Sequence, residues 1–379
     1  MRIGFDAKRA FHNKTGLGNY SRGLIHALAE HFPNESYFLF NPKPADLFHF
    51  HEKNIREINP SDLFYKKLKS LWRSFGMLGE MKKNQLDIFH GLSHEIPYKI
   101  RNTGIKSVVT IHDLITFRFP KQFSKFDAIM HQRKIKYACK NADVIVAISE
   151  QTKRDIIEYL DIDPAKIKVC YQHCDTKFSM LKSDLEKSEV LKKLGLPKNY
   201  FLYVGSIIER KNLLRICEAM KINQNKSNLP LVVVGNGGKY KESVKSFIQK
   251  NDMNEKIIFL SDVSNAKTDL GHDLPELYQS ATALVYPSEF EGFGIPVLEA
   301  LWSGTPVITS SISCLPEAGG PGSYYVDPQS ATEIATAMLM IESDESMRKK
   351  MIATGKDYAL NFTPKKSAEN IMKIYQSLL

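Results

Sequence analysis

Two carboxylates in one short segment are the residues best suited to binding a sugar or a ribose. Glu291 and Glu299 lie in SEFEGFGIPVLE, which follows the apolar run ALVYPS. Carboxylate oxygens accept hydrogen bonds from vicinal hydroxyl groups. Gly292 and Gly294 let the backbone approach a ligand closely, and the proline after them favours a first helical turn. We expect Glu291 in a loop and Glu299 in the first turn of a helix, both facing one crevice.

The same glutamates have two other interpretations. Glycosidases place a pair of carboxyl groups on either side of a glycosidic bond, and Glu291 with Glu299 has the right residue types. That interpretation gives no role to the cations at positions 210 and 211. Alternatively, the glutamates only complement the dipole of the helix. We favour sugar binding because it uses the whole segment.

Two adjacent cations, Arg210 and Lys211, follow the apolar run FLYVGS and precede the predicted helix NLLRICEAM. The dipole at the start of a helix disfavours positive charge, so an anion is expected nearby. A diphosphate fits, because helix-end amides, the guanidinium fork and the ammonium group all bind phosphate oxygens. A solvated surface pair neutralised by Glu209 is the alternative.

Apolar β-branched runs alternate with amphipathic stretches, a pattern typical of parallel sheets with crossover helices. The expected strands are RIGFDA, SYFLF, DIFHG, SVVTIHD, DVIVAIS and KIKVCYQ, followed after a charged stretch by FLYVGS, LVVVGN, KIIFL, ALVYPS, PVITS and SYYVD. We therefore expect two Rossmann-like domains, residues 1–180 and 181–362. The helix SDLEKSEVLKKL should end at Gly195, and a last helix over about 363–379 should pack back onto the first domain.

Ligands of open parallel sheets bind beyond the carboxyl ends of the strands, which directs attention to two further positions. A loop containing Gly16 to Ser21 (GLGNYS) follows the first strand and precedes a helix to about His31. Ser21 replaces the third glycine of a dinucleotide fingerprint and the turn is long, so a dehydrogenase is disfavoured. His112, directly after SVVTI, is well placed to reach into a cleft, or is a structural histidine.

Length, net charge and cysteine content restrict the kinds of partner and site that are expected. The chain has 379 residues, more than one core usually organises, and a net charge of +10, which favours phosphate or anionic lipid headgroups. With no signal peptide and no membrane span, we expect a cytoplasmic protein or one at the inner face of the membrane. The five scattered cysteines are expected to be buried thiols, and Asp161 with Asp163 a surface turn, so no metal site is predicted.

Most of the chain resembles the retaining glycosyltransferases of family 4, which have the GT-B fold. The resemblance is carried by GLGNYSRGLIHAL, TIHDL, VAIS, YVGSIIERKNL, YPSEFEGFGIPVLEALWSGTPVITS and LPEAGG, and its most specific element is E-x7-E, from Glu291 to Glu299. It implies an α/β protein with two facing Rossmann-like domains around a deep cleft. The N-terminal domain would bind the acceptor and the C-terminal domain a nucleotide-sugar donor, with no metal and no other cofactor.

Carried over by position, the resemblance implies catalytic roles for His112 and Glu291 and donor-binding roles for Gly16, Arg210, Lys211, Val263, Glu291, Phe293, Gly294, Ile295 and Glu299. The two cations and an amide of Gly16 would bind the diphosphate. Glu299 would bind the ribose, and Glu291 with the amides after it the sugar. The stretch Asn265 to Asp273 departs from the family by its length, close to Val263, where the base would be read.

The segment TIHDLITFRFP further resembles bacterial mannosyltransferases that extend surface polysaccharides. GDP-mannose is therefore the first expected donor and a UDP-hexose the alternative, with a glycan or lipid-linked glycan as acceptor. A GT-B-like sugar-nucleotide epimerase is a further alternative that needs acid and base residues around the sugar. Nucleic acid is not an expected partner, because basic residues with interleaved aromatics occur only between Phe64 and Lys83.

The segment from Phe64 to Lys83 has apolar residues at helical spacing among basic ones. The apolar residues are Phe64, Leu68, Leu71, Trp72, Phe75 and Leu78, and the basic ones Lys66, Lys67, Lys69, Arg73, Lys82 and Lys83. Such a segment could lie peripherally on an anionic membrane. A core-facing helix with a solvated face is the other interpretation, and both stay open.

Overall fold

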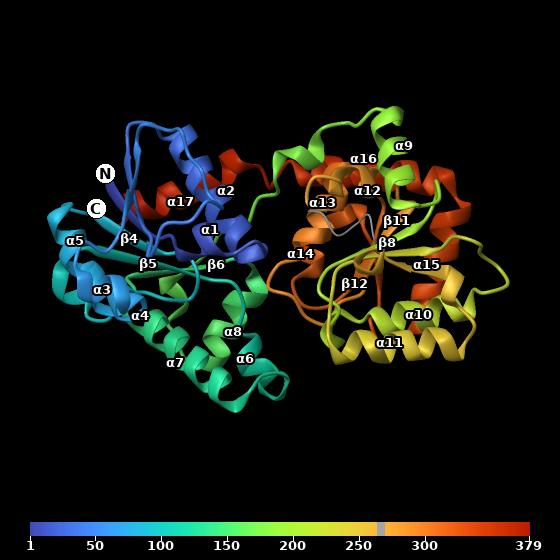
Figure 1. The fold of residues 1–379 in the computed structure, drawn as a ribbon, viewed down its shortest axis with the longest axis horizontal. Helices are drawn as coiled ribbons and strands as arrows, with labels where there is room; N and C mark the ends of the chain where they lie inside the picture. Colours follow the sequence, from blue (N-terminus) through green and yellow to red (C-terminus); the bar gives the residue numbers. More distant parts are fainter. Residues whose placement is uncertain (264–269) are drawn as a thin grey trace. The chain divides into compact units, whose positions relative to one another are not determined.

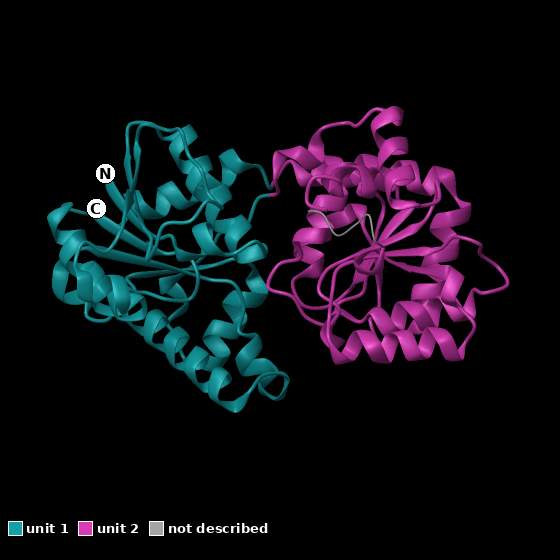
Figure 2. Cartoon of the chain, in the orientation of Figure 1, with its two compact units in different colours: residues 1–173, 362–379 teal, residues 174–361 magenta. Residues whose placement is uncertain are grey.

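The computed structural model describes residues 1–263 and 270–379, which form two compact units (Figure 2). Unit 1 comprises Met1–His173 and Phe362–Leu379, and unit 2 comprises Cys174–Asn361. The division thus lies slightly before the one expected at 180/181. Phe178 accounts for the difference, because it is buried and packs edge-on against Tyr278 of unit 2, with ring centroids 5.6 Å apart.

Unit 1 is built on a seven-stranded parallel sheet in the order β3-β2-β1-β4-β5-β6-β7 (Figure 1). Its strands are β1 (Arg2–Asp6), β2 (Ser36–Phe40), β3 (Ile55–Ile58), β4 (Ile88–Gly91), β5 (Lys106–Ile111), β6 (Val144–Ala147) and β7 (Ile167–Val169). The sequence predicted all of them except β3. This edge strand exposes Arg56 and Glu57, so it lacks the continuous apolar run of a strand buried on both faces.

The helices of unit 1 cover this sheet. They are α1 (Lys8–His12), α2 (Gly16–His31), α3 (Leu63–Lys67), α4 (Lys69–Leu71), α5 (Met77–Lys83), α6 (Ile115–Arg118), α7 (Lys125–Asn141), α8 (Glu150–Leu160) and α17 (Pro364–Gln376). The last helix, α17, packs against α2 and buries Ile371, Met372 and Tyr375 in the same core (Figure 1). The hydroxyl of Tyr375 lies 2.6 Å from Nδ1 of His90 at the end of β4. The end of the chain therefore completes the unit in which it began.

The predicted loop at Gly16 to Ser21 is wrong, because α2 already begins at Gly16. The side chain of Asn13 accepts hydrogen bonds from the backbone N–H groups of Thr15 at 2.8 Å and Gly18 at 3.2 Å, which fixes the start of the helix. A Cβ at Gly18 would lie 1.8 Å from the carbonyl oxygen of Asn13. Gly18 therefore serves the packing of a helix start rather than a flexible loop, whereas Gly16 is exposed.

The segment from Phe64 to Lys83 is not one helix but α3, α4, a π-helical turn (Trp72–Gly76) and α5 in succession. Trp72 is 1% exposed and belongs to the core, as the core-facing interpretation requires. Phe64, Leu68 and Phe75 are nevertheless 57%, 42% and 46% exposed. The segment therefore has both a buried face and an exposed apolar one.

Unit 2 contains a six-stranded parallel sheet in the order β10-β9-β8-β11-β12-β13. Its strands are β8 (Phe201–Val204), β9 (Leu231–Val234), β10 (Ile257–Phe259), β11 (Ala283–Tyr286), β12 (Val307–Ser310) and β13 (Tyr324–Val326), all predicted from the sequence. Its helices are α9 (Asp184–Leu194), α10 (Leu213–Ile222), α11 (Lys239–Lys250), α12 (Leu274–Ser280), α13 (Ile295–Ser303), α14 (Leu315–Gly319), α15 (Ala331–Ser343) and α16 (Glu345–Ala359).

Local signals account for several element ends. Ser183 and Glu186 form a capping box at the start of α9, and Gly195 ends it with a φ of 65°, as predicted. Asp161 ends α8 and Asp163 caps the short turn that follows, which confirms the surface turn.

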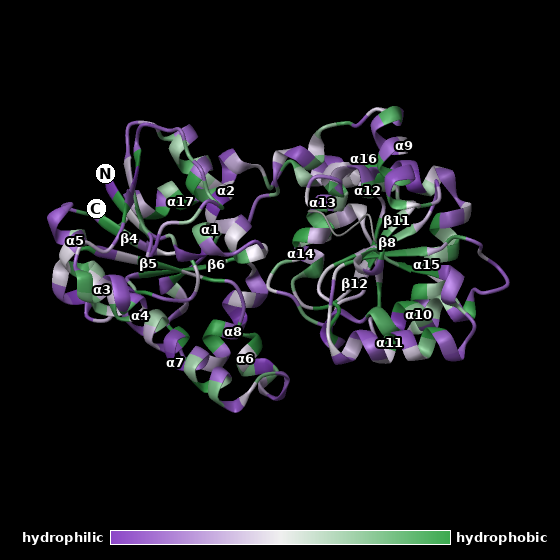
Figure 3. Cartoon of the chain, in the orientation of Figure 1, coloured by the Kyte–Doolittle hydropathy of each residue, from purple (hydrophilic) through white to green (hydrophobic). Residues whose placement is uncertain are grey.

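The strands of both sheets are predominantly apolar in Figure 3, as expected for parallel strands covered on both faces. No helix among the described residues combines the length and apolar content needed to cross a bilayer.

Candidate active site

The loop between β8 and α10 holds Arg210 and Lys211 in a rigid turn. Asn212 adopts a left-handed conformation, with φ of 61°, and its side chain donates hydrogen bonds to the carbonyls of Pro287 at 3.1 Å and Pro328 at 2.6 Å. The side chains of Arg210 and Lys211 are 8% and 13% exposed. The interpretation as a solvated surface pair is therefore wrong.

The loop between β11 and α13 is held by contacts from the end of β12 and from the residue before α14. Ser310 donates a hydrogen bond to the carbonyl of Ser288 at 2.6 Å, and the thiol of Cys314 contacts the carbonyls of Glu291 and Phe293 at 3.0 and 3.1 Å. Gly294 caps α13 with a φ of 115°, which favours glycine. A Cβ there would also lie 2.9 Å from the side chain of Leu315. The loop that carries Glu291 is thus held in one conformation.

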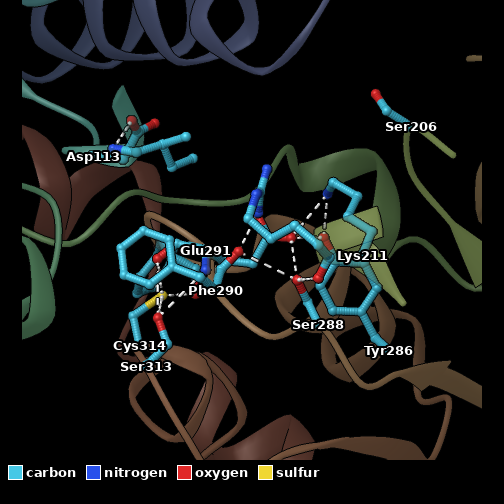
Figure 4. Close-up of polar contacts among 12 residues, drawn as sticks. Asp113, Ser206, Lys211, Tyr286, Ser288, Phe290, Glu291, Ser313 and Cys314 are labelled. Carbon is cyan, nitrogen blue, oxygen red and sulfur yellow. Dashed lines mark hydrogen bonds and ion pairs between the residues drawn. The ribbon is translucent and has the colours of Figure 1, made fainter. Parts of the chain in front are cut away.

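The two loops meet at the carboxylate of Glu291 (Figure 4). Its Oε1 lies 3.1 Å from Nζ of Lys211, and its Oε2 lies 3.3 Å from Nη1 of Arg210. Tyr286 and Ser288 donate hydrogen bonds to Oε1 at 2.8 and 2.9 Å. Burial by itself would raise the pKa of Glu291, but the charges of Lys211 and Arg210 and the hydrogen bond from Tyr286 outweigh it and lower the pKa to about 2.

This cluster joins Arg210 and Lys211, which were expected to bind the donor diphosphate, with Glu291, which was expected to bind the sugar. Arg210 also donates a hydrogen bond to the carbonyl of Phe290, so its guanidinium is tied to the loop as well as to the carboxylate. Two cations share one carboxylate, which leaves one net positive charge in a partly buried position. The Nε of Arg210 has no hydrogen-bond partner within the described residues. The cluster is therefore both preorganised and suited to a further anion.

Glu299 lies in a different environment from Glu291. The sequence predicted Glu299 in the first turn of α13. The helix already begins at Ile295, so Glu299 lies in its second turn. The hydroxyl of Tyr278 donates a hydrogen bond to its Oε2 at 2.8 Å. Burial raises the pKa of Glu299 to about 7, against the smaller lowering effects of this hydrogen bond and of Lys177.

The backbone of Phe293, Gly294 and Ile295 forms the start of α13. Phe293 is buried, and Gly294 is the residue before the first turn. The first amides of a helix lack acceptors within it, so those of Gly294 and Ile295 are suited to hydroxyl or anionic oxygens. Val263 follows a short 3-10 turn after β10, whose Asp262 pairs with Lys241 at 2.7 Å. Of the unusual stretch 265–273, residues 265–269 lie outside the described part of the chain.

Two of the predicted site residues, Gly16 and His112, belong to unit 1. Gly16 is the exposed first residue of α2, and Tyr20, one turn later, packs edge-on against His112 with ring centroids 4.7 Å apart. His112 is buried, its Nε2 lies 2.9 Å from the carbonyl oxygen of Leu92, and Gln172 donates to its Nδ1 at 3.3 Å. Burial lowers its pKa to about 4. The ring is therefore neutral at neutral pH, with the proton on Nε2.

Several supporting residues were missed from the sequence. Tyr286 and Ser288 hold Glu291, Tyr278 holds Glu299, and Cys314 holds the loop. Tyr286 ends a strand, so the rule that selects strand ends could have found it. No sequence signal marked Tyr278 or Cys314, which act from elements distant in the chain. All five cysteines are buried and unpaired, as expected. No grouping of three metal-ligating side chains occurs in the described ranges.

Comparison with known proteins identifies the family. Residues 15–178 match the family model described as Glycosyltransferase Family 4, and residues 186–358 match that described as Glycosyl transferases group 1. The chain belongs to the family 4 glycosyltransferases. This glycosyltransferase has the α/β, GT-B fold class predicted from its sequence, with its two parallel sheets in separate units.

Relatives of this glycosyltransferase extend over its whole length. It is 25% identical to the O-antigen chain mannosyltransferase B of Escherichia coli, over 100% of both chains. It is 32% identical to the O-antigen chain mannosyltransferase RfbU of Salmonella typhimurium, over 66% of this chain and 63% of that protein. Among solved structures, Anabaena HepE in complex with UDP-glucose has a TM-score of 0.73 at 16% identity, covering 99% of both chains, and supports the fold.

Proposed function

We propose that the protein is a retaining, metal-independent mannosyltransferase that moves mannose from GDP-mannose onto a glycan or lipid-linked glycan in surface polysaccharide synthesis. The observation that carries the proposal is the cluster in which Arg210 and Lys211 share the ionised Glu291 at the start of α13. The O-antigen mannosyltransferases among its relatives support the choice of sugar and pathway.

Each residue of the cluster has a defined task in this proposal. Arg210 and Lys211 bind the donor diphosphate, to which Gly16 adds an amide, and they stabilise the negative charge that grows on the leaving phosphate. Glu291 and the amides at the start of α13 bind hydroxyl groups of the transferred sugar. Glu299 accepts a hydrogen bond from the ribose, and Val263 lies where the base is read.

The reaction breaks the bond between the anomeric carbon and the phosphate oxygen. The acceptor hydroxyl attacks the same face, so the configuration is retained, and its proton passes to the departing phosphate. No protein base is needed. His112 is neutral in this role and contacts the sugar without exchanging a proton, because one ring nitrogen faces a carbonyl and the other an amide donor.

Glu291 is poorly suited to the glycosidase mechanism weighed from the sequence. A nucleophilic carboxylate needs an oxygen directed at the substrate, whereas Oε1 accepts hydrogen bonds from Tyr286 and Ser288 and both oxygens lie beside cations. A UDP-hexose remains the second candidate donor, because HepE, which has a similar fold, binds UDP-glucose.

Thermal unfolding with a panel of GDP- and UDP-sugars tests the donor. We expect GDP-mannose to raise the melting temperature of the wild type most, and the effect to disappear in Arg210→Ala, with Lys239→Ala as the matched control outside the cluster. Arg210→Ala must first be shown to be folded by its circular dichroism. If no nucleotide sugar stabilises the wild type, the proposed function fails. If only UDP-sugars do, the donor is the second candidate.

A further inference from the structure

Unit 1 contains a cavity of about 480 Å³ between α1, the segment after β2, and the segment that begins at α4. Lys8 and His12 of α1, Lys43 beyond β2, and Lys69 and Arg73 of the segment from α4 onward contribute to its lining. Its volume is in the range of small-molecule sites, about 300–1,000 Å³. The proposed donor site does not use any of these residues.

The lining of this cavity, named here the basic cavity, contains four cations and no carboxylate. Arg73 is compensated from behind, because its guanidinium donates to Asp6 and lies 3.3 Å from Glu95. Lys8, Lys43 and Lys69 form no ion pair with a carboxylate in the described part of the chain. The three lysines therefore carry positive charge that no ion pair among the described residues neutralises.

Electrostatics within the basic cavity favours an incoming anion. Burial lowers the pKa of Lys8 and the neighbouring charge of Arg73 lowers it further, while the carboxylates of Glu95 and Asp6 act in the opposite direction. An anion between the amines would remove this repulsion. The backbone that carries Lys43 is held in place, because Nε2 of His12 lies 3.0 Å from the side-chain oxygen of Asn41 and 3.2 Å from the carbonyl of Lys43. A tetrahedral phosphate oxygen set suits several converging ammonium groups.

Exposed apolar residues lie next to the lining residues of the basic cavity in the sequence. Lys69 stands between Leu68 and Leu71, which are each 42% exposed, and Phe75 follows Arg73 closely. Phe64 of the preceding helix is also exposed. Both α3 and α4 contain apolar and hydrophilic residues (Figure 3). A ligand that reaches both features needs an anionic group and a hydrocarbon part.

We propose that the basic cavity binds the phosphate or diphosphate of a lipid-linked acceptor, whose hydrocarbon part lies over Phe64, Leu68, Leu71 and Phe75. The identification of this lipid as the acceptor rests on the proposed function. The binding of the anionic group does not.

Titration calorimetry with inorganic pyrophosphate tests the anion site on the full chain. The cavity variant is Lys43→Ala/Lys69→Ala, and the matched control is Lys66→Ala/Lys67→Ala, which removes the same charge from exposed positions of α3. All proteins are titrated with and without GDP, which occupies the proposed donor site. We expect pyrophosphate to bind in the presence of GDP and its affinity to fall at least about tenfold in the cavity variant only.

The outcomes of this titration separate the two proposals. Pyrophosphate binding that is unchanged in the cavity variant, equally weakened in both variants, or fully displaced by GDP overturns the basic cavity as an anion site. Failure of GDP itself to bind counts against the proposed function, while the comparison of the two variants without GDP still decides the cavity.

Vesicle co-sedimentation tests the lipid part. Phosphatidylcholine vesicles carry either a polyprenyl diphosphate or phosphatidylglycerol at equal total charge. We expect the wild type to prefer the polyprenyl diphosphate, and the cavity variant and Leu68→Ser/Leu71→Ser to lose that preference. Pyrophosphate binding without a preference between the vesicles overturns the lipid source and leaves a site for soluble phosphates.

Discussion

The two units differ in how far the cationic side chains that follow their strands are buried and paired with carboxylates. In unit 2, Arg210 and Lys211 are almost buried and share the carboxylate of Glu291, which is itself held by two hydroxyl groups. In unit 1, Lys43 and Lys69 are exposed, and the cavity they line contains no carboxylate. The first arrangement fixes cations before a ligand arrives, as electrostatic catalysis requires. The second leaves their side chains exposed and without an ion pair to any described residue, which suits binding more than positioning.

The units also differ in how buried titratable groups respond to pH. Unit 1 buries histidines in their neutral form: burial lowers the pKa of His112 to about 4 and that of His90 to about 3. Unit 2 buries Glu299, whose pKa is raised to about 7. Acid therefore acts in opposite directions on the two units between about pH 7 and 5.

The largest expected effect is acid destabilisation of unit 1 alone. A histidine with a lowered pKa in the folded state loses stability as the pH falls below about 6.5, where only the unfolded chain takes up the proton. Each of His90 and His112 costs about 2 kcal/mol at pH 5. Hydrogen exchange by mass spectrometry, corrected for intrinsic rates, should show protection lost in unit 1 before unit 2. Equal loss in both units would contradict the comparison.

Glu291→Gln is expected to have the next largest effect, on unit 2. It leaves Arg210 and Lys211 without their carboxylate in a partly buried position, which costs about 3 kcal/mol in urea unfolding at neutral pH. Glu289→Gln is the matched control, because that side chain pairs only with Gln329 among the described contacts and its loss should cost under about 0.5 kcal/mol.

The pH profile of Glu291→Gln gives a second measurement. Because the pKa of Glu291 is lowered to about 2, its stabilisation is complete above about pH 4.5 and is lost as the pH falls toward 2. The difference between wild type and variant should shrink over that range. A difference that stays constant in acid would show that the loss is one of packing and not of charge.

Glu299→Gln should stabilise the unliganded protein at high pH. The raised pKa means that burying the carboxyl group costs nothing below about pH 4.5 and costs most above about pH 7. The variant, whose amide oxygen can still accept from Tyr278, should gain about 3 kcal/mol at pH 8 and nothing at pH 4.5. Stabilisation by a nucleotide sugar should weaken at the same time. A gain that is independent of pH would refute the assigned titration.

The smallest effect is expected for Lys69→Ala in unit 1. The amine has no ion-pair partner among the described residues, so the free energy of unfolding should change by less than about 0.5 kcal/mol. Lys67→Ala should behave alike in this assay, although the two differ in anion binding. A loss above about 1 kcal/mol at Lys69 would mean that the basic cavity is already compensated.

The sequence predicted the strands well because parallel strands buried on both faces are continuous apolar runs. It missed β3, whose Arg56 and Glu57 are exposed at the sheet edge. It placed Gly16 in a loop because glycines signal flexibility, whereas here Gly18 permits contact with the backbone of Asn13. This contact depends on the backbone geometry of the helix start, which the spacing of the glycines does not specify.

The candidate site was predicted in its residues but not in its pairing. Arg210, Lys211 and Glu291 were each selected, because they follow strands and have the right chemistry. Their shared ion pair was not foreseen, since the two loops are far apart in the chain and meet only through the order of β8 and β11. The support from Tyr278 and Cys314 could not be predicted for the same reason.

The place of α17 in unit 1 bears on how the protein is made. Unit 2 is continuous in sequence, so all its residues are synthesised before the last helix. Unit 1, although most of it is made first, lacks the helix that packs on α2 and the hydroxyl of Tyr375 that pairs with His90. The unit that begins the chain therefore finishes folding last, and an incomplete nascent chain would expose apolar surface on α2.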